Sequence, residues 1–482
     1  MNPFRHIWTK AEGTATIPHA EGTMKLRRLT RIGWMIVSLC LTLGIPSVTS
    51  AQGGSGNPTD LILADAIKMA LEKHPALRAA ALQSAAASAG VDQARAAFLP
   101  RVDFSEGFTQ GNNPVYAFGS LLSQGRFSQA DFAVDKLNHP SSISNWRMNI
   151  AGSLPLFMGG RMALGYQQAQ LGYVAAERGR ARVEQEIIFE VIRTYHGILL
   201  AQEAQATVES AVHTAEANLA SAEARLDAGV AVASDALAAR VRLARLKEEA
   251  IAAGNQVRLA YASLNDAMGA PLEQIYRIAG RLDLTPLRFD RPEGLGATAL
   301  AERPDYRQAM LEEQRLEREV LRTKAAFLPS LHLMGNYEIN NHYLASNGQD
   351  SWSVGVILNF NLFSGGSDFA RVAAAQANHQ RAGALRERMA SGIRLEVRDA
   401  FLALQTARER VTVAKGAVTY AEESLRIVQD RYDAGLTTIV ELLDSETALT
   451  AARTNLTRTL YDATVGQSRL DLSLGTLDRA RF

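Results

Sequence analysis

The sequence is poor in cysteine, in excess charge and in long hydrophobic runs. Its single cysteine, Cys40, lies in a segment that we expect to be removed, so the mature chain would have no disulfide, thiolate metal site or cysteine nucleophile. The 51 basic and 50 acidic residues nearly balance, which argues against a nucleic-acid-binding protein because such domains are usually strongly basic. After Ala51 no apolar run reaches the roughly 20 residues of a membrane-spanning helix, which excludes that kind of span there.

Motifs for enzymes and cofactors are also lacking. No His-x-x-x-His pair with a nearby carboxylate occurs after Ala51, so the sequence predicts no zinc site. The glycine-rich stretch at 53–56 is not followed by Lys-Ser or Lys-Thr, as a P-loop requires. We therefore expect a protein that is not an enzyme, binds no cofactor and does not itself energise transport.

The first 51 residues are typical of an export signal. Met24 to Arg31 is basic, Ile32 to Leu43 is apolar, and Thr49-Ser50-Ala51 supplies small residues for cleavage. Met24 is itself a candidate start of translation. We expect export from the cytoplasm, removal of residues 1–51 and an N-terminal linker over 52–66.

An internal repeat organises the rest of the chain. Two copies of one long unit indicate a duplicated protomer, because a solenoid would have many copies. The first copy carries 23 extra residues between Pro100 and Leu156. The repeated segments are LFMGG (156–160) with LFSGG (362–366), RLDAG (225–229) with RYDAG (431–435), and AFLP (97–100) with AFLP (326–329). We expect a first repeat over 67–270, an inter-repeat equatorial segment over 271–295, a second repeat over 296–476 and a C-terminal tail over 477–482.

Most of each copy has the hydrophobic period of a coiled-coil helix. Apolar residues alternate at spacings of four and three with many small residues among them, which favours close helix packing. The longest such stretch would form a rod of roughly 100 Å, which turns back at a glycine. Ser234 and the capping box Thr438-x-x-Glu441 indicate where the returning helices begin. The returning helix is only half as long as the rod, so the helix ending near Phe98 should complete it. The expected helices are 67–98, 160–228 and 235–268 in the first copy, and 297–327, 366–434 and 439–474 in the second.

The remaining segments have the period of strands. Each copy contributes two stretches of about ten residues with apolar and mostly polar positions in alternation, long enough to cross a bilayer at a tilt. Trp146 and Trp352 occupy equivalent strand starts, as in an interfacial aromatic girdle. An amphipathic sheet packed on a soluble core is the alternative, but no other segment is left to cover it. The expected strands are 99–110, 146–157, 328–340 and 352–363.

Four strands cannot close a membrane barrel, because the smallest such barrels have about eight. Open strand edges in lipid would leave backbone groups unsatisfied, so the chain should associate with identical copies. Three copies supply twelve strands, and their long helices would form a hollow bundle continuous with the barrel. The sequence thus predicts a conduit that is attached to outer-membrane lipid and reaches into the periplasm.

The duplicated AFLP, LFxGG and RxDAG segments and their spacing resemble those of the TolC-like outer-membrane efflux proteins over nearly all of the expected mature chain. This resemblance implies a homotrimer with a 12-stranded β-barrel and a 12-helix periplasmic α-barrel. It implies docking to a periplasmic adaptor protein and to an inner-membrane pump of the RND or ABC type. The chain would then be the passive exit channel of a tripartite efflux or type I secretion system.

The resemblance also assigns roles near the hairpin tips. Gly229-Val230 and Gly435-Leu436 match the turns that contact adaptor hairpins, although a plain glycine helix stop is the alternative. Glu441 and Asp444 match the paired acidic positions of the periplasmic constriction, where three copies would make two carboxylate rings open to block by metal ions. For Glu441 the capping box is the alternative role.

A third assignment concerns the gate. Asp235 and Tyr432 match a pair that holds the entrance closed by hydrogen bonding between neighbouring hairpins. The arginine that reinforces this latch falls on Thr437 here, so we expect a weaker or differently built gate.

Two questions stay open at the level of sequence. The insert at 110–145 should form the larger extracellular loop, but its purpose and the transported substrate are not determined. A structural periplasmic coiled-coil tether that bridges envelope layers is the alternative function, because a tether could use soluble capping domains where a conduit needs lipid-facing strands.

Overall fold

The computed structural model describes residues 60–284, 291–344, 346 and 348–478. The expected export signal, residues 52–59 of the expected linker and the last four residues of the tail lie outside this part of the chain. Each copy of the repeat folds as two short helices, two strands and a helical hairpin. The first copy contains α1 (Leu63–Lys73), α2 (Pro75–Ala96), β2 (Arg101–Gly111), β3 (Ile143–Phe157), α5 (Arg161–Asp227) and α6 (Ala233–Met268). The second contains α7 (Leu295–Glu302), α8 (Pro304–Lys324), the 3₁₀ turn η2 (Ala325–Phe327), β5 (Ser330–Asn341), β6 (Gln349–Asn359), α9 (Ser367–Asp433) and α10 (Ile439–Leu474).

The helices expected at 67–98 and 297–327 are each broken in two, which corrects the prediction of single helices. The breaks fall at His74 and Arg303, whose ψ angles of 126° and 123° are extended. Each of these residues precedes a proline, and the proline ring disfavours helical geometry in the residue before it while fitting the first turn of the next helix. The sequence showed both prolines, but the helical period continued across them.

The returning helices α6 and α10 end against these breaks. Their C-terminal glycines, Gly269 and Gly475, have φ angles of 66° and 74°. A Cβ atom at Gly269 would lie 3.1 Å from the Cα of His74, and one at Gly475 would lie 2.8 Å from the Cα of Arg303. Glycine is therefore needed for both the left-handed conformation and the close approach. This contact confirms that α6 is completed by the helix pair that ends near Phe98.

The expected linker and inter-repeat segment contain ordered structure. The short strand β1 (Asp60–Leu61) pairs in parallel with β4 (Arg277–Ile278), and α1 begins at Leu63, so the linker expected to reach residue 66 ends earlier. The buried Tyr195 hydroxyl donates to the carbonyls of Leu61 (3.0 Å) and Ala279 (2.5 Å). These bonds tie both segments to the middle of α5.

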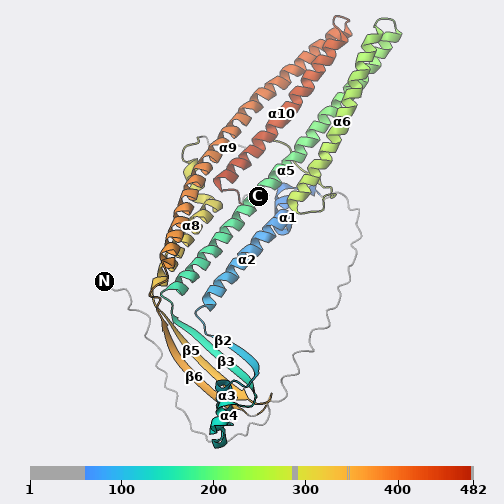
Figure 1. Ribbon diagram of the computed structural model, residues 1–482. Coiled ribbons are helices and arrows are strands. Elements are labelled where there is room, and N and C mark those ends of the chain that lie inside the picture. Colours follow the sequence, from blue (N-terminus) through green and yellow to red (C-terminus); the bar gives the residue numbers. More distant parts are fainter. Residues whose placement is uncertain (1–59, 285–290, 345, 347, 479–482) are drawn as a thin grey trace, which may run out of the picture. The chain divides into compact units, whose positions relative to one another are not determined.

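The shorter helices pack against the long helices α5 and α9 in two rows, one in each half of these long helices. Each has 67 residues, or about 100 Å of helix. In the half that carries the hairpin tips the order is α6, α5, α10, α9, and in the half next to the strands it is α2, α5, α8, α9 (Figure 1). None of the helices among the described residues contains a stretch long and apolar enough to cross a membrane.

The four longer strands form one antiparallel sheet in the order β2-β3-β5-β6. Its register aligns apolar side chains in rows on one face, for example Phe104, Ile150, Tyr337 and Trp352. Most of these apolar side chains are exposed, and within the described residues no helix covers this face. A large exposed apolar surface of this kind marks a site of association or membrane contact.

Strand β6 ends at Asn359, four residues earlier than expected. Its partner β5 begins at Ser330, directly after Pro329, and Ser330 pairs with Asn359. Phe360 to Phe363 continue the alternating pattern but pair with no strand among the described residues, and Leu362 and Phe363 are exposed.

The insert between β2 and β3 folds into helices. It contains α3 (Pro114–Ser123), the 3₁₀ helix η1 (Gln129–Phe132) and α4 (Val134–Asn138). Asn113 caps α3 by accepting hydrogen bonds from the backbone N–H groups of Val115 and Tyr116, and Pro114 occupies the first turn. The insert lies at the end of the sheet that is farther from the long helices (Figure 1).

Candidate functional site: the hairpin tips

The two hairpin tips have the same backbone structure. Gly229 and Gly435 adopt φ angles of 74° and 73°, and the space around each would accept a Cβ atom, so conformation alone requires glycine. The N–H of Val230 donates to the carbonyl of Arg225 (3.0 Å), and the N–H of Leu436 donates to the carbonyl of Arg431 (2.8 Å). These are the closing bonds of Schellman motifs, which end α5 and α9.

Val230 and Leu436 project from these tips with 77% and 70% of their surface exposed. In a Schellman motif the residue at this position usually packs on an apolar side chain three residues inside the helix end. Here those residues are Arg225 and Arg431, which offer no apolar partner. The two side chains are therefore available to another protein.

The returning helices begin in different ways. Thr438 caps α10 by accepting from the N–H of Glu441 (3.4 Å). Helix α6 begins at Ala233, with Val232 as its N-cap, so Ser234 lies inside the helix and the expectation that it caps α6 was wrong. The carboxylate of Glu441 accepts a hydrogen bond from the Thr437 hydroxyl and lies 3.7 Å from Nη1 of Arg431.

An apolar cluster joins the two hairpins just behind the tips, and we call it the tip cluster. Small residues on the first hairpin allow the larger side chains of the second to approach closely. Its members are Leu219, Ala222, Leu226, Ala236 and Ala239 from the first hairpin, with Leu425, Val428, Tyr432, Ile439, Leu442 and Leu443 from the second.

Tyr432 lies at the end of the tip cluster and is only 7% exposed. Burial raises the pKa of Tyr432; the cation of Arg225 opposes this rise, and the charge of Asp235 adds to it. Asp235 of the first hairpin thus lies near enough to Tyr432 of the second for its charge to raise the pKa of that phenol.

Arg225 is a contact residue that sequence reasoning missed. Its guanidinium carbon lies 4.5 Å from the centre of the Tyr432 ring, and its Nη1 donates to the carbonyl of Tyr432 at 3.0 Å. Its Nη2 also lies 3.4 Å from Oδ1 of Asp433. Arg225 thus joins the first hairpin to the second, whereas Thr437 bonds within its own hairpin. The sequence shows that Arg225 recurs as Arg431 in the second copy. It does not show that Arg225 contacts the other hairpin whereas Arg431 contacts its own.

Glu441 and Asp444 both lie on the exposed side of α10. Leu442, a member of the tip cluster, and Glu446 are instead buried. The two carboxylates are one turn apart, as the sequence predicts for neighbours on one helix face. No group of three or more His, Cys, Asp or Glu side chains in the described part of the chain could hold a metal ion.

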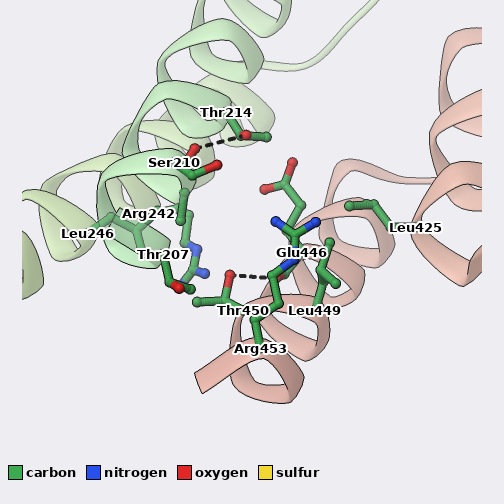
Figure 2. Close-up of a pocket in the computed structure, with 11 residues that line it drawn as sticks. Thr207, Ser210, Thr214, Arg242, Leu246, Leu425, Glu446, Leu449, Thr450 and Arg453 are labelled. Carbon is green, nitrogen blue, oxygen red and sulfur yellow. Dashed lines mark hydrogen bonds between the residues drawn. The ribbon is translucent and has the colours of Figure 1, made fainter. Parts of the chain in front are cut away.

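Glu446 is a second contact that the sequence analysis missed. It is 7% exposed and accepts a hydrogen bond from the Asn218 side-chain amide of α5. A cavity of about 40 Å³ lies beside it, lined also by Arg242, Arg453 and the hydroxyls of Thr207, Ser210 and Thr214 (Figure 2). Its position between Leu442 and Leu449 is that of a coiled-coil core residue, which was the available signal.

Burial dominates the ionisation of Glu446. It raises the pKa of this carboxyl, while the Asn218 amide and the charge of Arg242 oppose the rise. Arg453 is held by Glu422 of α9 at 2.8 Å, so Arg242 of α6 is the cation left to face Glu446. The Nε of Arg242 is buried and makes no hydrogen bond within the described structure. The contact between the hairpins therefore contains a carboxyl whose charged form is disfavoured.

The tryptophans expected in a girdle lie on the apolar face of the sheet. The ring of Trp146 contacts Phe108 with centroids 4.8 Å apart, and Trp352 is 75% exposed beside Tyr337. The register places Trp352 in the row of Ile150, four residues along β3 from Trp146.

Comparison with known proteins matches this arrangement to a family. The family model described as outer membrane efflux protein covers residues 66–270 and 295–476, which are the two copies of the repeat. The chain belongs to this family. It is a TolC-like outer-membrane channel protein that extends into the periplasm, in a family of channels and not of enzymes.

Individual members of the outer membrane efflux protein family are distant in sequence. The alkaline protease secretion protein AprF of Pseudomonas aeruginosa is 26% identical over 429 residues, which cover 87% of this chain and 85% of that protein. The outer membrane protein TolC of Vibrio cholerae is 24% identical over 428 residues, 86% of this chain and 91% of that protein. The CmeC outer membrane channel of Campylobacter jejuni superposes with a TM-score of 0.75 at 18% identity, covering 91% of this chain and 96% of that chain.

The buried Glu446 generates a pH-dependent prediction. Because the pKa of Glu446 is raised in the folded protein, protonation of its carboxyl stabilises the hairpin contact. This stabilisation is complete below the pKa of the unfolded state, about 4.3. It is lost as the pH rises through the higher pKa of the folded state. Glu446→Gln should therefore stabilise the protein at neutral pH, and its advantage over the wild type should grow from about pH 4 to about pH 8. Thermal unfolding midpoints in detergent measure this. Glu409→Gln, an exposed carboxylate of α9, controls for loss of one negative charge; an advantage of Glu446→Gln that stays constant with pH would contradict the prediction.

Proposed function

We propose that this chain is the outer-membrane exit channel of a tripartite efflux or type I secretion system, built as a homotrimer. The proposal rests on one observation. Among the described residues, both the sheet and the row of helices end in outer elements that have no partner on their outward side. A passive pore follows if these edges join between identical copies around an axis.

The sheet has one such pair of edges. β2 and β6 are its outer strands, and their outward N–H and C=O groups would each cost several kcal/mol if left unpaired in lipid. Pairing β2 of one protomer with β6 of the next satisfies both edges. The apolar face would then contact the lipid and the polar face the lumen, with Trp146 and Trp352 as girdle residues.

The helices have a corresponding pair of edges. On α9 the exposed side chains of Val413, Tyr420 and Ile427 follow one another at intervals of seven, which is a coiled-coil seam without a partner in the protomer. On the opposite side α6 exposes Leu237, Val241 and Ile251. Packing α6 on α9 of the next protomer joins two different surfaces, and such contacts form a ring when the rotation between copies closes.

The strands require more than one copy, and the family resemblance implies three. One protomer supplies four, whereas the smallest membrane barrels have about eight. Three copies with four strands each give a 12-stranded β-barrel. Three copies with four hairpin helices each give a 12-helix α-barrel, as the family resemblance implies. The hairpin tips then lie at the periplasmic end.

The tips supply the partner surface. Val230 and Leu436 would contact the hairpins of a periplasmic adaptor, which connects the channel to an inner-membrane RND or ABC-type pump. Relatives include proteins named for alkaline protease secretion and for toluene efflux, so the family resemblance is compatible with both kinds of cargo. Glu441 and Asp444 would form the carboxylate rings of the entrance, and Asp235, Tyr432 and Arg225 would hold it closed.

The oligomer is the first test. Purified from outer membranes in detergent, the wild type should run as a heat-sensitive trimer and conduct ions across planar bilayers. Tyr420→Asp with Ile427→Asp places two charges in the α9 seam and should abolish the trimer band, because buried unpaired charges oppose association. Lys415→Asp, at an exposed position of the same helix, is the matched control. A stable water-soluble monomer would refute the proposed homotrimer, and a trimer unaffected by the seam variant would refute the proposed α6–α9 contact.

Ion selectivity is the second test. Glu441→Ala with Asp444→Ala removes two carboxylates from each protomer, so cation selectivity and block by trivalent cations should fall several-fold. Reversal potentials across a salt gradient measure the selectivity. Asp266→Ala with Glu273→Ala removes two exposed carboxylates, one near the far end of α6 and one just beyond it, and should leave the selectivity unchanged. Unchanged selectivity in the first variant would remove Glu441 and Asp444 from the constriction.

Adaptor docking is the third test. Val230→Asp with Leu436→Asp should abolish copurification of the adaptor, because desolvating a carboxylate at an apolar contact costs several kcal/mol, while conductance persists. Val115→Asp with Val134→Asp makes the same kind of change at exposed positions of the insert. Normal adaptor recovery with charged tips would place the docking surface elsewhere.

A further inference from the structure

The insert between β2 and β3 crosses the sheet on its polar side. The Gln124 side-chain amide donates to Oδ1 of Asn145 at 2.9 Å and to the carbonyl of Ser144 at 2.8 Å. Asn145 precedes Trp146, which lies on the apolar face, and successive side chains of a strand point to opposite faces. The anchor of α3 therefore lies on the face of Asn145, Arg147 and Glu338.

Helix α3 reaches every strand of the sheet. The Tyr116 hydroxyl donates to the carbonyl of Thr109 in β2 at 2.7 Å. Gln124 also approaches the carbonyl of Asn341 in β5 at 3.4 Å, and Gly125 lies against the side chain of Gln349 in β6. Residues at the two ends of α3 thus bond to β2, β3 and β5 and approach β6, so the helix is attached to the wall and is not a freely moving loop.

The sequence of α3 suits this position. Ala117, Ser120 and Gln124 are buried and are spaced as one helix face, and the side chain of Gln124 bonds to the sheet. Below this contact a polar chain continues along the same face, in which Asn145 donates to Asn340 (2.7 Å) and Asn340 donates to Glu338 (2.6 Å).

A second layer lies on top of α3. The ring of Phe127 stands edge to face with those of Phe118 and Phe132 at 4.8 and 5.0 Å, which holds η1 and α4 over the helix. A cavity of about 200 Å³ remains between the layers, lined by Phe118, Leu121 and Leu137 among others. The insert thus has a second layer packed on α3.

We infer that α3, held by Gln124, is an outer constriction of the channel that determines the size of what can pass the external end of the barrel. This inference rests on the proposed function, in which the polar face lines the lumen. Three copies of the insert would then project from the wall toward the axis. The corresponding β5–β6 connection is short and has no such helix among its described residues, so each protomer contributes one.

The test uses thiol labelling from outside the cell, with Cys40 replaced by serine. Ser353→Cys places a thiol on the polar face of β6, and Val354→Cys places one on the apolar face. In the variant without the insert, Gly111 is joined to Ile143 by Asn-Gly; these residues face each other in the register, so a two-residue turn can connect them. The reagents are a small membrane-impermeant maleimide and a bulky polyethylene-glycol maleimide.

With the insert present, Ser353→Cys should react with the small reagent and not with the bulky one; without the insert it should react with both. Gln124→Ala should restore part of the bulky labelling and guards against misfolding of the larger deletion, while Gln129→Ala, exposed in η1, should not. Heat-sensitive trimers verify assembly in each case. Equal labelling of Ser353→Cys by both reagents with the insert present would refute the constriction but not the channel. If Ser353→Cys does not react with the small reagent, or if Val354→Cys does react, the polar face does not line the lumen. Either of these two results would also refute the proposed function.

Discussion

Backbone hydrogen bonds that the protomer cannot make within itself are the constraint on which the rest of this structure depends. The sheet ends in two open strands, β2 and β6, and its apolar face has no cover among the described residues. The helices continue the same row, with α6 and α9 at its margins. The outer strands and the outer helices lie on the same two sides of the protomer. One mode of association between copies would therefore pair both the strands and the helices, and a conduit would result.

The duplicated repeat gives the two hairpins the same backbone arrangement. Sequence differences between the copies give contacts that only one of the two hairpins makes. Arg225 crosses to Tyr432, while its repeat partner Arg431 faces Glu441 in its own hairpin. Position 446 carries a buried glutamate where the first copy has Arg240, an exposed residue paired with Glu223. The two hairpins therefore have the same backbone and different surfaces, as neighbours that meet each other must.

Polar contacts in the hairpin seam restrict how the helices can slide. Apart from Tyr432, the tip cluster consists of small and aliphatic side chains, which by themselves tolerate several alignments. The bonds of Glu446 with Asn218 and of Arg225 with Tyr432 are each satisfied in one alignment only. We regard them as setting the register of the hairpins at some cost in stability, as single polar residues do in coiled coils.

The sequence by itself determined the elements: the duplicated order, the strand and helix periods, the long rods and the glycine tips all depend on neighbours a few residues away. It did not reveal the breaks at His74 and Arg303 as helix ends, because the apolar period continues through them. Only the tertiary structure decided that Arg225 and Glu446 join the hairpins and that α3 lies on the polar face. Those contacts link residues from about twenty to more than two hundred positions apart, and they depend on helix rotation and strand register, which no local pattern contains.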